Sequence, residues 1–213
     1  IVFQVSRLMI KLGILDLLRD RDDGMTIADI ADKTKLSVYA VKVLIEASLT
    51  IGTVLVNKKS ARYQISKTGW FLLNDPATKV NIDFNQDVNY IGFYNLEDAL
   101  TEGKPIGLKH FGEWSTIYEG LSQLPENVKT SWFAFDHYYS DSSFEQALQI
   151  VFGKRPKTLL DVGGNTGRWA VRCVGHNKNV HVTILDLPQQ IKMMQEHIKG
   201  KDGAERIDGF GTN

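Results

Sequence analysis

The chain has 213 residues, of which 43% are hydrophobic and 23% charged, a composition that supports a sizeable core and excludes a disordered or collagen-like protein. Its 25 basic residues equal its 25 acidic ones, which excludes an overall charge that would attract nucleic acid or an anionic membrane. The single cysteine, Cys173, excludes an intrachain disulfide and a cysteine-based zinc cluster, so we expect a reducing, cytoplasmic location.

No apolar run reaches the roughly 18 residues that a membrane span needs. The N-terminus, Ile-Val-Phe-Gln, lacks both a methionine and a signal-peptide pattern. We therefore expect no membrane segment, and we interpret the chain as a portion of a longer protein.

The N-terminal part predicts helices followed by a hairpin. The expected elements are helices over residues 1–20, 26–33 and 37–49, and extended segments over 53–56 and 63–65. Thr26 and Asp29 have capping-box spacing, Ser37 is a second N-cap, and Gly52 ends the third helix. This order of helix, turn, helix and hairpin is typical of a winged helix-turn-helix.

The middle of the chain is helical and rich in aromatic residues. The expected elements are a helix over 68–73, one or two helices within 80–102, and helices over 125–139 and 144–152. Pro125 suits a first helical turn, and Ser142 with Glu145 has capping-box spacing.

The pattern changes near residue 157. Apolar, β-branched runs alternate with helical ones, in the order strand 158–162, helix 168–174, strand 180–185 and helix 189–198. This alternation predicts the start of a parallel α/β sheet after a mostly α N-terminal part.

A glycine-containing turn follows the first of these strands, and an acid ends the second. Gly163, Gly164 and Gly167 let the backbone approach a ligand closely, and Asp186 is placed to accept hydrogen bonds from ribose hydroxyls. The dinucleotide fingerprint fails, because its glycines would fall at Asn165 and at residue 168, which is an arginine.

The pattern that remains is D-x-G-G-x-x-G, with Asp161 at the strand end. An acid there suits a ligand that carries a cationic sulfonium and an amino group rather than phosphate. A glycine-rich turn without any ligand is the alternative interpretation.

These segments resemble a known family. TLLDVGGNTG with VTILDLP resembles class I S-adenosylmethionine-dependent methyltransferases, and more narrowly the O-methyltransferases of the hydroxyindole and caffeate type. The resemblance continues along the chain in LGILDLL, TIADIADKTKLSVYAVKVLIEASLTIGTV, YQISKTGWFLL and TEGKPIGLKHFG. It implies a winged-helix dimerisation domain over 1–75, a helical connector over 76–156, and an incomplete Rossmann-like cofactor domain over 157–213.

By this resemblance, the cofactor is S-adenosylmethionine. Gly163 matches the glycine nearest its methionine part, Asp186 matches the acid on the ribose diol, and Gly164 and Gly167 match turn glycines. Asn165 stands where the family has a third glycine, and the turn is expected to survive because asparagine tolerates a left-handed backbone.

The third strand also departs from the family. Phe210 lies where the family has an acid that contacts adenine, so adenine is expected to be bound by stacking or by backbone groups. The family's general-base histidine falls beyond Asn213, and no metal is implied.

The aromatic connector supplies candidates for the acceptor pocket. By resemblance, Phe135, Tyr138, Tyr139 and His137 are predicted to line it. Core packing for the aromatic residues, and an ordinary hydrogen-bonded role for His137, are the alternatives.

The helix-turn-helix also raises a DNA-binding hypothesis. The segment from Gly24 to Trp70 has four more basic than acidic residues, but the helix over 37–49 has only Lys42 as a basic residue, opposed by Glu46. It has no arginine, asparagine or glutamine to read base edges. A basic face formed by Lys42, Lys58, Lys59 and Arg62 together would favour DNA.

We therefore predict an S-adenosylmethionine-dependent O-methyltransferase that acts on a small aromatic or hydroxylated metabolite and forms a homodimer through its N-terminal domain. A winged-helix regulator that senses an adenosyl metabolite and a non-catalytic family member are the alternatives. Methylation of nitrogen or carbon is left open.

Overall fold

A computed structural model describes residues 1–212 of the chain, which divides into two compact units, residues 1–83 and the part that begins at Phe84. Asn213, the last residue of the predicted cofactor domain, lies outside the described residues. The two units are described in turn.

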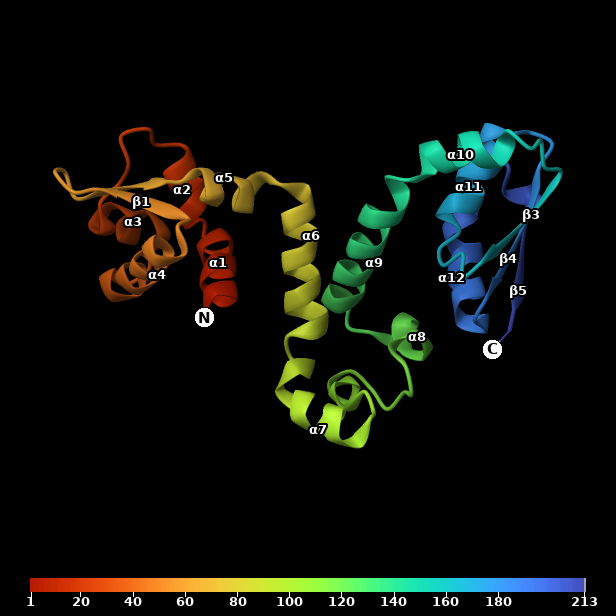
Figure 1. Cartoon of the computed structure of the whole chain (residues 1–213), viewed down its shortest axis with the longest axis horizontal. Coiled ribbons are helices and arrows are strands. Elements are labelled where there is room, and N and C mark those ends of the chain that lie inside the picture. Colours follow the sequence, from red (N-terminus) through yellow and green to blue (C-terminus); the bar gives the residue numbers. More distant parts are fainter. Residues whose placement is uncertain (213) are drawn as a thin grey trace. The chain divides into compact units, whose positions relative to one another are not determined.

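The first unit combines helices with a two-stranded hairpin. Its elements are α1 (Val2–Lys11), α2 (Ile14–Arg19), α3 (Ile27–Thr34), α4 (Val38–Ile51), β1 (Val54–Asn57), β2 (Arg62–Ile65), α5 (Lys67–Asn74) and α6 (Pro76–Phe84), which ends at the second unit (Figure 1). Met9, Ile14, Leu15, Ile30 and Ile45 are fully buried and form one core across α1 to α4.

Side-chain caps begin the two central helices, as the sequence predicts. The Thr26 hydroxyl accepts a hydrogen bond from the Asp29 N–H, and the Asp29 carboxylate accepts one from the Thr26 N–H, both at 3.2 Å. The Ser37 hydroxyl accepts from the Ala40 N–H at 3.1 Å. Each cap satisfies backbone N–H groups that have no partner inside the helix.

The single helix predicted over residues 1–20 is wrong, because the chain breaks into α1 and α2. Gly13 has a φ of +71° and separates them. The apolar spacing continues across the break, so the periodicity alone did not reveal it. A left-handed glycine ends one helix and starts the next in a new direction.

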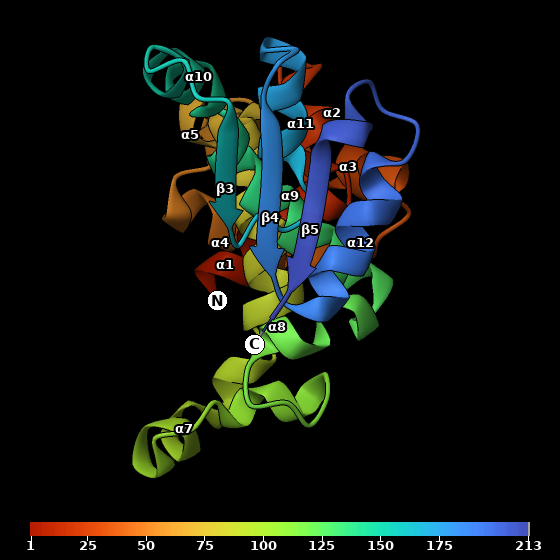
Figure 2. The same ribbon diagram turned by 90° about the vertical axis from the view of Figure 1, so that its right-hand side faces the viewer.

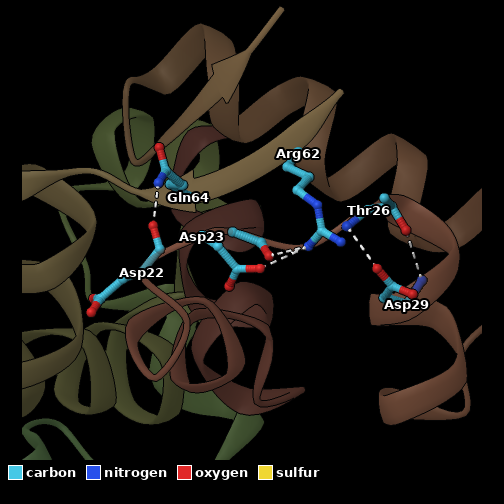
Figure 3. Close-up of polar contacts among 7 residues, drawn as sticks. Asp22, Asp23, Thr26, Asp29, Arg62 and Gln64 are labelled. Carbon is cyan, nitrogen blue, oxygen red and sulfur yellow. Dashed lines mark hydrogen bonds and ion pairs between the residues drawn. The ribbon is translucent and has the colours of Figure 1, made fainter. Parts of the chain in front are cut away.

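The hairpin is tied to the loop before α3 by Arg62 and Gln64 (Figure 3). The Arg62 guanidinium donates to the Gly24 carbonyl at 2.7 Å and lies 3.4 Å from the Asp23 carboxylate. The Gln64 amide donates to the Asp22 carbonyl at 2.5 Å. These two side chains of β2 therefore fasten the hairpin to the loop before α3.

The second unit begins with short helical segments. They are the π-helical turn η1 (Asn85–Asn89), the 3₁₀ turns η2 (Gly92–Asn95), η3 (Ile106–His110) and η4 (Leu121–Gln123), and the helices α7 (Leu96–Glu102), α8 (Ile117–Gly120), α9 (Glu126–Asp141) and α10 (Phe144–Phe152). The prediction of one or two helices within 80–102 is right for α7, which ends at Glu102, but it misses the turns η1 and η2 between α6 and α7. The backbones of η2 and η3 approach each other closely, since a Cβ added to Gly107 would lie 2.8 Å from the Gly92 Cα atom.

The predicted capping box before α10 is also wrong. Neither Ser142 nor Ser143 makes a side-chain cap; their hydroxyls donate back to the carbonyls of Tyr139 and Ser140, at 3.2 and 2.7 Å. Glu145 instead lies 3.3 Å from the Arg172 guanidinium. The serine hydroxyls therefore bond to carbonyls at the end of α9 and do not cap the N–H groups of α10.

A parallel sheet forms the rest of the unit, as predicted. Its elements are β3 (Thr158–Val162), α11 (Arg168–His176), β4 (His181–Asp186), α12 (Pro188–Ile198), η5 (Ala204–Arg206) and β5 (Ile207–Gly211). The strand order is β3-β4-β5, and Val162 pairs with Leu185, so the carboxyl ends of β3 and β4 are adjacent.

One face of this sheet is covered and the other is bare in the described residues. Helices α11 and α12 lie on the same side of the strands (Figure 1), and Val182 and Ile184 are fully buried beneath them. The opposite face, turned toward the viewer in Figure 2, exposes Leu160, Val162 and Phe210.

Loss of the α3 capping box is expected to loosen that helix. Thr26→Ala removes an N-cap worth about 1 kcal/mol, so protection of the α3 amides against hydrogen exchange should fall about fivefold. Thr50→Ala, an exposed site at the end of α4, is the matched control and should change protection little. Equal protection in Thr26→Ala and the unaltered protein would contradict this account.

Candidate functional site

The turn between β3 and α11 is left-handed at three positions. Gly163, Asn165 and Gly167 have φ values of +74°, +52° and +76°. Asn165 thus adopts the conformation that glycine adopts freely and that asparagine tolerates better than most residues. The turn expected from the sequence forms with an asparagine in place of the third glycine.

The glycines of this turn differ in their surroundings. A Cβ added to Gly164 would lie 2.7 Å from the Asp161 Oδ2 atom, and one added to Gly167 would lie 2.8 Å from the Met194 Cγ atom. A Cβ added to Gly163 would meet no atom within 4 Å. Gly164 and Gly167 are therefore needed for packing, whereas Gly163 borders open space that a ligand can enter.

Backbone N–H groups hold the carboxylate of Asp186 at the end of β4. Its Oδ2 accepts from the Asn165 N–H and its Oδ1 from the Leu187 N–H, both at 2.8 Å. A carboxylate oxygen can accept more than one hydrogen bond, so both oxygens keep acceptor capacity for hydroxyl groups. This is the arrangement that a ribose diol requires.

Asp161 lies on the neighbouring strand with an unsatisfied charge. Its Oδ2 atom is buried and has no hydrogen-bond partner among the described residues. Burial raises the pKa of the Asp161 carboxyl, and the negative charge of Asp186 raises it further. A positive charge beside these two carboxylates would favour their ionised forms and so offset both effects.

The predicted cofactor residues divide into two groups. The structure brings Asp161, the turn residues and Asp186 together at the carboxyl ends of two adjacent strands. Phe210 lies on β5 opposite Leu185 in the register, and 62% of its surface is exposed on the bare face of the sheet. Its predicted role at adenine stays a prediction.

A cavity of about 630 Å³ lies between α9 and α12, and His137 is one of its lining residues. Burial lowers the pKa of the His137 imidazole, and the positive charge of Arg168 lowers it further. The ring is therefore neutral at physiological pH and can accept a hydrogen bond or a proton.

The other three predicted pocket residues lie outside this cavity. Phe135 stacks on Phe84 with ring centroids 4.1 Å apart, and Tyr139 contacts Phe135 at 4.9 Å. Tyr138 packs edge-on against Tyr139. These aromatic residues pack on each other, and their role in an acceptor pocket remains a prediction.

Sequence reasoning missed most of the residues that line the cavity, among them Phe133, Thr166 and His197. Phe133 was identifiable, because it lies four residues before His137 on the same helix face and stacks on its ring at 5.8 Å. Thr166 and His197 come from other elements, so only the fold reveals them. The Thr166 hydroxyl is buried and has no partner in the described part of the chain.

The helix-turn-helix surface shows a different character from a DNA-binding face. Lys42 lies 3.7 Å from the Glu46 carboxylate, and Arg62 is bound to Asp23 and the Gly24 carbonyl. Two of the four basic residues that would favour DNA are thus paired internally. Tyr39 and Val43, one turn apart on α4, are 77% and 45% exposed. Helix α4 therefore presents exposed apolar side chains beside Lys42, whose charge is paired with Glu46.

The order of the elements corresponds to the first part of the fold of solved S-adenosylmethionine-dependent methyltransferases. Residues 1–63 match the model of the Dimerisation2-like domain. Acetylserotonin O-methyltransferase of Macaca mulatta is 22% identical over 228 residues, covering 95% of this chain and 61% of that protein.

Solved structures show the same fold. "PigF with SAH" superposes with a TM-score of 0.71 at 19% identity, over 99% of this chain and 62% of the other. Human N-acetylserotonin methyltransferase in complex with SAM gives a TM-score of 0.63 at 18% identity, over 100% and 62%. These matches confirm the predicted resemblance. The chain spans about 60% of the length of the curated relatives named acetylserotonin O-methyltransferase.

Removing the charge of Asp161 is expected to stabilise the ligand-free protein. Its raised folded-state pKa means that the carboxylate opposes folding, and the penalty grows as pH rises above the usual aspartate pKa of 3.8. Asp161→Asn should therefore raise the melting temperature at pH 7, and its effect should fade as the pH drops well below 3.8, where the carboxyl is protonated in both the folded and the unfolded state.

Asp202→Asn, at an exposed position, is the control and should leave the melting temperature unchanged at both pH values. A lower melting temperature for Asp161→Asn at pH 7 would show that the carboxylate has a stabilising partner.

Proposed function

We propose that this protein is an S-adenosylmethionine-dependent O-methyltransferase that acts on a small aromatic or hydroxylated metabolite. The observation that carries the proposal is the pair of carboxylates, Asp161 and Asp186, on either side of a left-handed turn at adjacent strand ends. The relatives named as O-methyltransferases, and the solved structures named with SAM and SAH, support the same function.

The residues fit this cofactor by their chemistry. When bound, S-adenosylmethionine supplies a methyl group on a cationic sulfonium. Asp161 offers a buried, unpartnered oxygen for the amino group, Asp186 offers acceptors for the ribose hydroxyls, and Gly163 leaves room for the methionine part.

The reaction we propose is an in-line displacement. The acceptor oxygen forms a bond to the methyl carbon as the carbon–sulfur bond breaks, and the hydroxyl proton passes to a general base. The protein aligns the two reactants and excludes water. By resemblance the base is a histidine beyond Asn213, and His137 is a candidate on the acceptor side, since it lines the cavity beside Thr166.

We also propose that the three predicted regions divide this work. Residues 1–75 form a winged-helix dimerisation domain, 76–156 a connector that contributes to the acceptor pocket, and 157–213 the cofactor domain. The Dimerisation2-like match over residues 1–63 and the exposed Tyr39 and Val43 support a homodimer through the first region.

Binding of S-adenosylhomocysteine to the full-length protein tests the cofactor proposal. A ligand present at 100 times its dissociation constant adds about 2.7 kcal/mol of stability, so a thermal scan should show a clear rise in melting temperature. Asp186→Ala should abolish that rise, because it removes the acceptors for the ribose, while Asp202→Ala should keep it.

NAD and a DNA duplex are the ligand controls for this scan. No shift with S-adenosylhomocysteine at millimolar concentration would overturn the enzyme proposal. A shift with the DNA duplex instead would favour a winged-helix regulator.

The dimer proposal is tested by charge on α4. Tyr39→Glu and Val43→Glu place carboxylates on a face proposed to be buried between subunits, and light scattering after gel filtration should then show monomers. Glu46→Gln, on the same helix, is the control. A full-length protein that is monomeric without any substitution would contradict the proposal.

A further inference from the structure

A side chain of helix α9 forms a hydrogen bond with the cofactor turn. The Asn165 amide Nδ2 donates to the Asp136 Oδ2 atom at 2.6 Å, and the contact is partly buried. The acceptor is a carboxylate, and hydrogen bonds with an ionised partner are about twice as strong as neutral ones. Asp136 and Asn165 are 29 residues apart and come from regions predicted to be separate, the connector and the cofactor domain.

The same asparagine also touches Asp186. Its backbone N–H donates to the Asp186 Oδ2 atom at 2.8 Å while its side chain is held by Asp136. Its φ of +52° costs an asparagine more than it costs a glycine, so a contact that holds the side chain favours this conformation. Asn165 thus connects α9 to the carboxylate assigned to the ribose.

Helix α9 is itself held on both sides of Asp136. The Ser131 hydroxyl donates to the Asp87 carboxylate of η1 at 2.6 Å. The Asp141 carboxylate lies 2.6 Å from the Arg168 guanidinium, at the first residue of α11. Helix α9 therefore has contacts on both sides of Asp136 besides the one to Asn165.

We propose that Asp136 is a positioning residue for the cofactor turn. Its carboxylate accepts a hydrogen bond from the side-chain amide of Asn165. This bond maintains the left-handed conformation in which the backbone N–H of Asn165 points to Asp186. The hydrogen bond between Asp136 and Asn165 thus stabilises a left-handed conformation that a glycine at position 165 would adopt without help. The consequence for the cofactor rests on the proposed function, whereas the effect on the turn does not.

A double-mutant cycle on the full-length protein tests this role, with S-adenosylhomocysteine as the probe in titration calorimetry. Asp136→Ala should weaken its binding about tenfold, equivalent to about 1.4 kcal/mol. In an Asn165→Gly background the turn no longer needs a side-chain hold, so Asp136→Ala should then change binding less than twofold. Asp136→Asn, which keeps an acceptor oxygen, should restore most of the affinity and serves if the alanine variant does not fold.

The control is Asp141→Asn, which weakens the contact to Arg168 and leaves the Asp136–Asn165 pair in place. Its effect should be the same in the unaltered protein and in the Asn165→Gly background. If Asp136→Ala weakens S-adenosylhomocysteine binding equally in both backgrounds, Asp136 acts through helix packing only, and the proposal fails. If Asp136→Ala does not weaken binding in the protein that keeps Asn165, the proposal is also overturned.

Hydrogen exchange without ligand separates this proposal from that of function. Asp136→Ala should speed exchange of the Asn165 amide, which donates to Asp186, and should have no such effect on the amide of residue 165 in the Asn165→Gly background. If the unaltered protein binds no S-adenosylhomocysteine, the proposed function fails, and this exchange measurement still decides the role of Asp136.

Discussion

Two hydrogen bonds to one carboxylate organise the candidate site. Asp186 accepts from the backbone N–H of Asn165, in the turn after β3, and from that of Leu187, at the start of α12. The bond from Asn165 ties the end of β4 to the neighbouring turn, and the bond from Leu187 orients the carboxylate. The open space beside Gly163 and the unpartnered oxygen of Asp161 lie at the same adjacent strand ends. At this site the buried Oδ2 atom of Asp161 has no hydrogen-bond partner among the described residues, whereas both oxygens of Asp186 already accept one bond each.

The first unit uses its charges differently. Arg62 of β2 pairs with the Asp23 carboxylate and donates to the Gly24 carbonyl, and Gln64 donates to the Asp22 carbonyl. Polar side chains thus connect the hairpin to the loop before α3. On α4, by contrast, the apolar side chains of Tyr39 and Val43 remain exposed.

Local rules predicted much of this structure. The capping box at Thr26 and Asp29, the stop at Gly52 and the order of strands and helices after residue 157 each depend on neighbours in sequence, and each is found. The break at Gly13 and the segmentation of 80–102 were missed, because apolar spacing continues through both.

The site was partly predictable for the same reason. Asp161, the turn glycines and Asp186 follow from strand ends, which the sequence indicates. The contact between Asp136 and Asn165, and the meeting of Thr166 with His197 at one cavity, join residues far apart in the chain. No local sequence pattern predicts these two contacts, because they form only when α9 and α12 are placed beside the turn after β3.

The bare face of the sheet has a practical consequence. Leu160 and Val162 are 65% and 70% exposed on β3, beside Leu185 and Phe210 in the register. Parallel strands are usually covered on both faces, and an uncovered apolar surface of this kind promotes aggregation and binds hydrophobic dyes. Residues 1–213 produced alone would therefore be prone to self-association in solution, and a bright dye signal from such a sample would report this surface rather than a misfolded core.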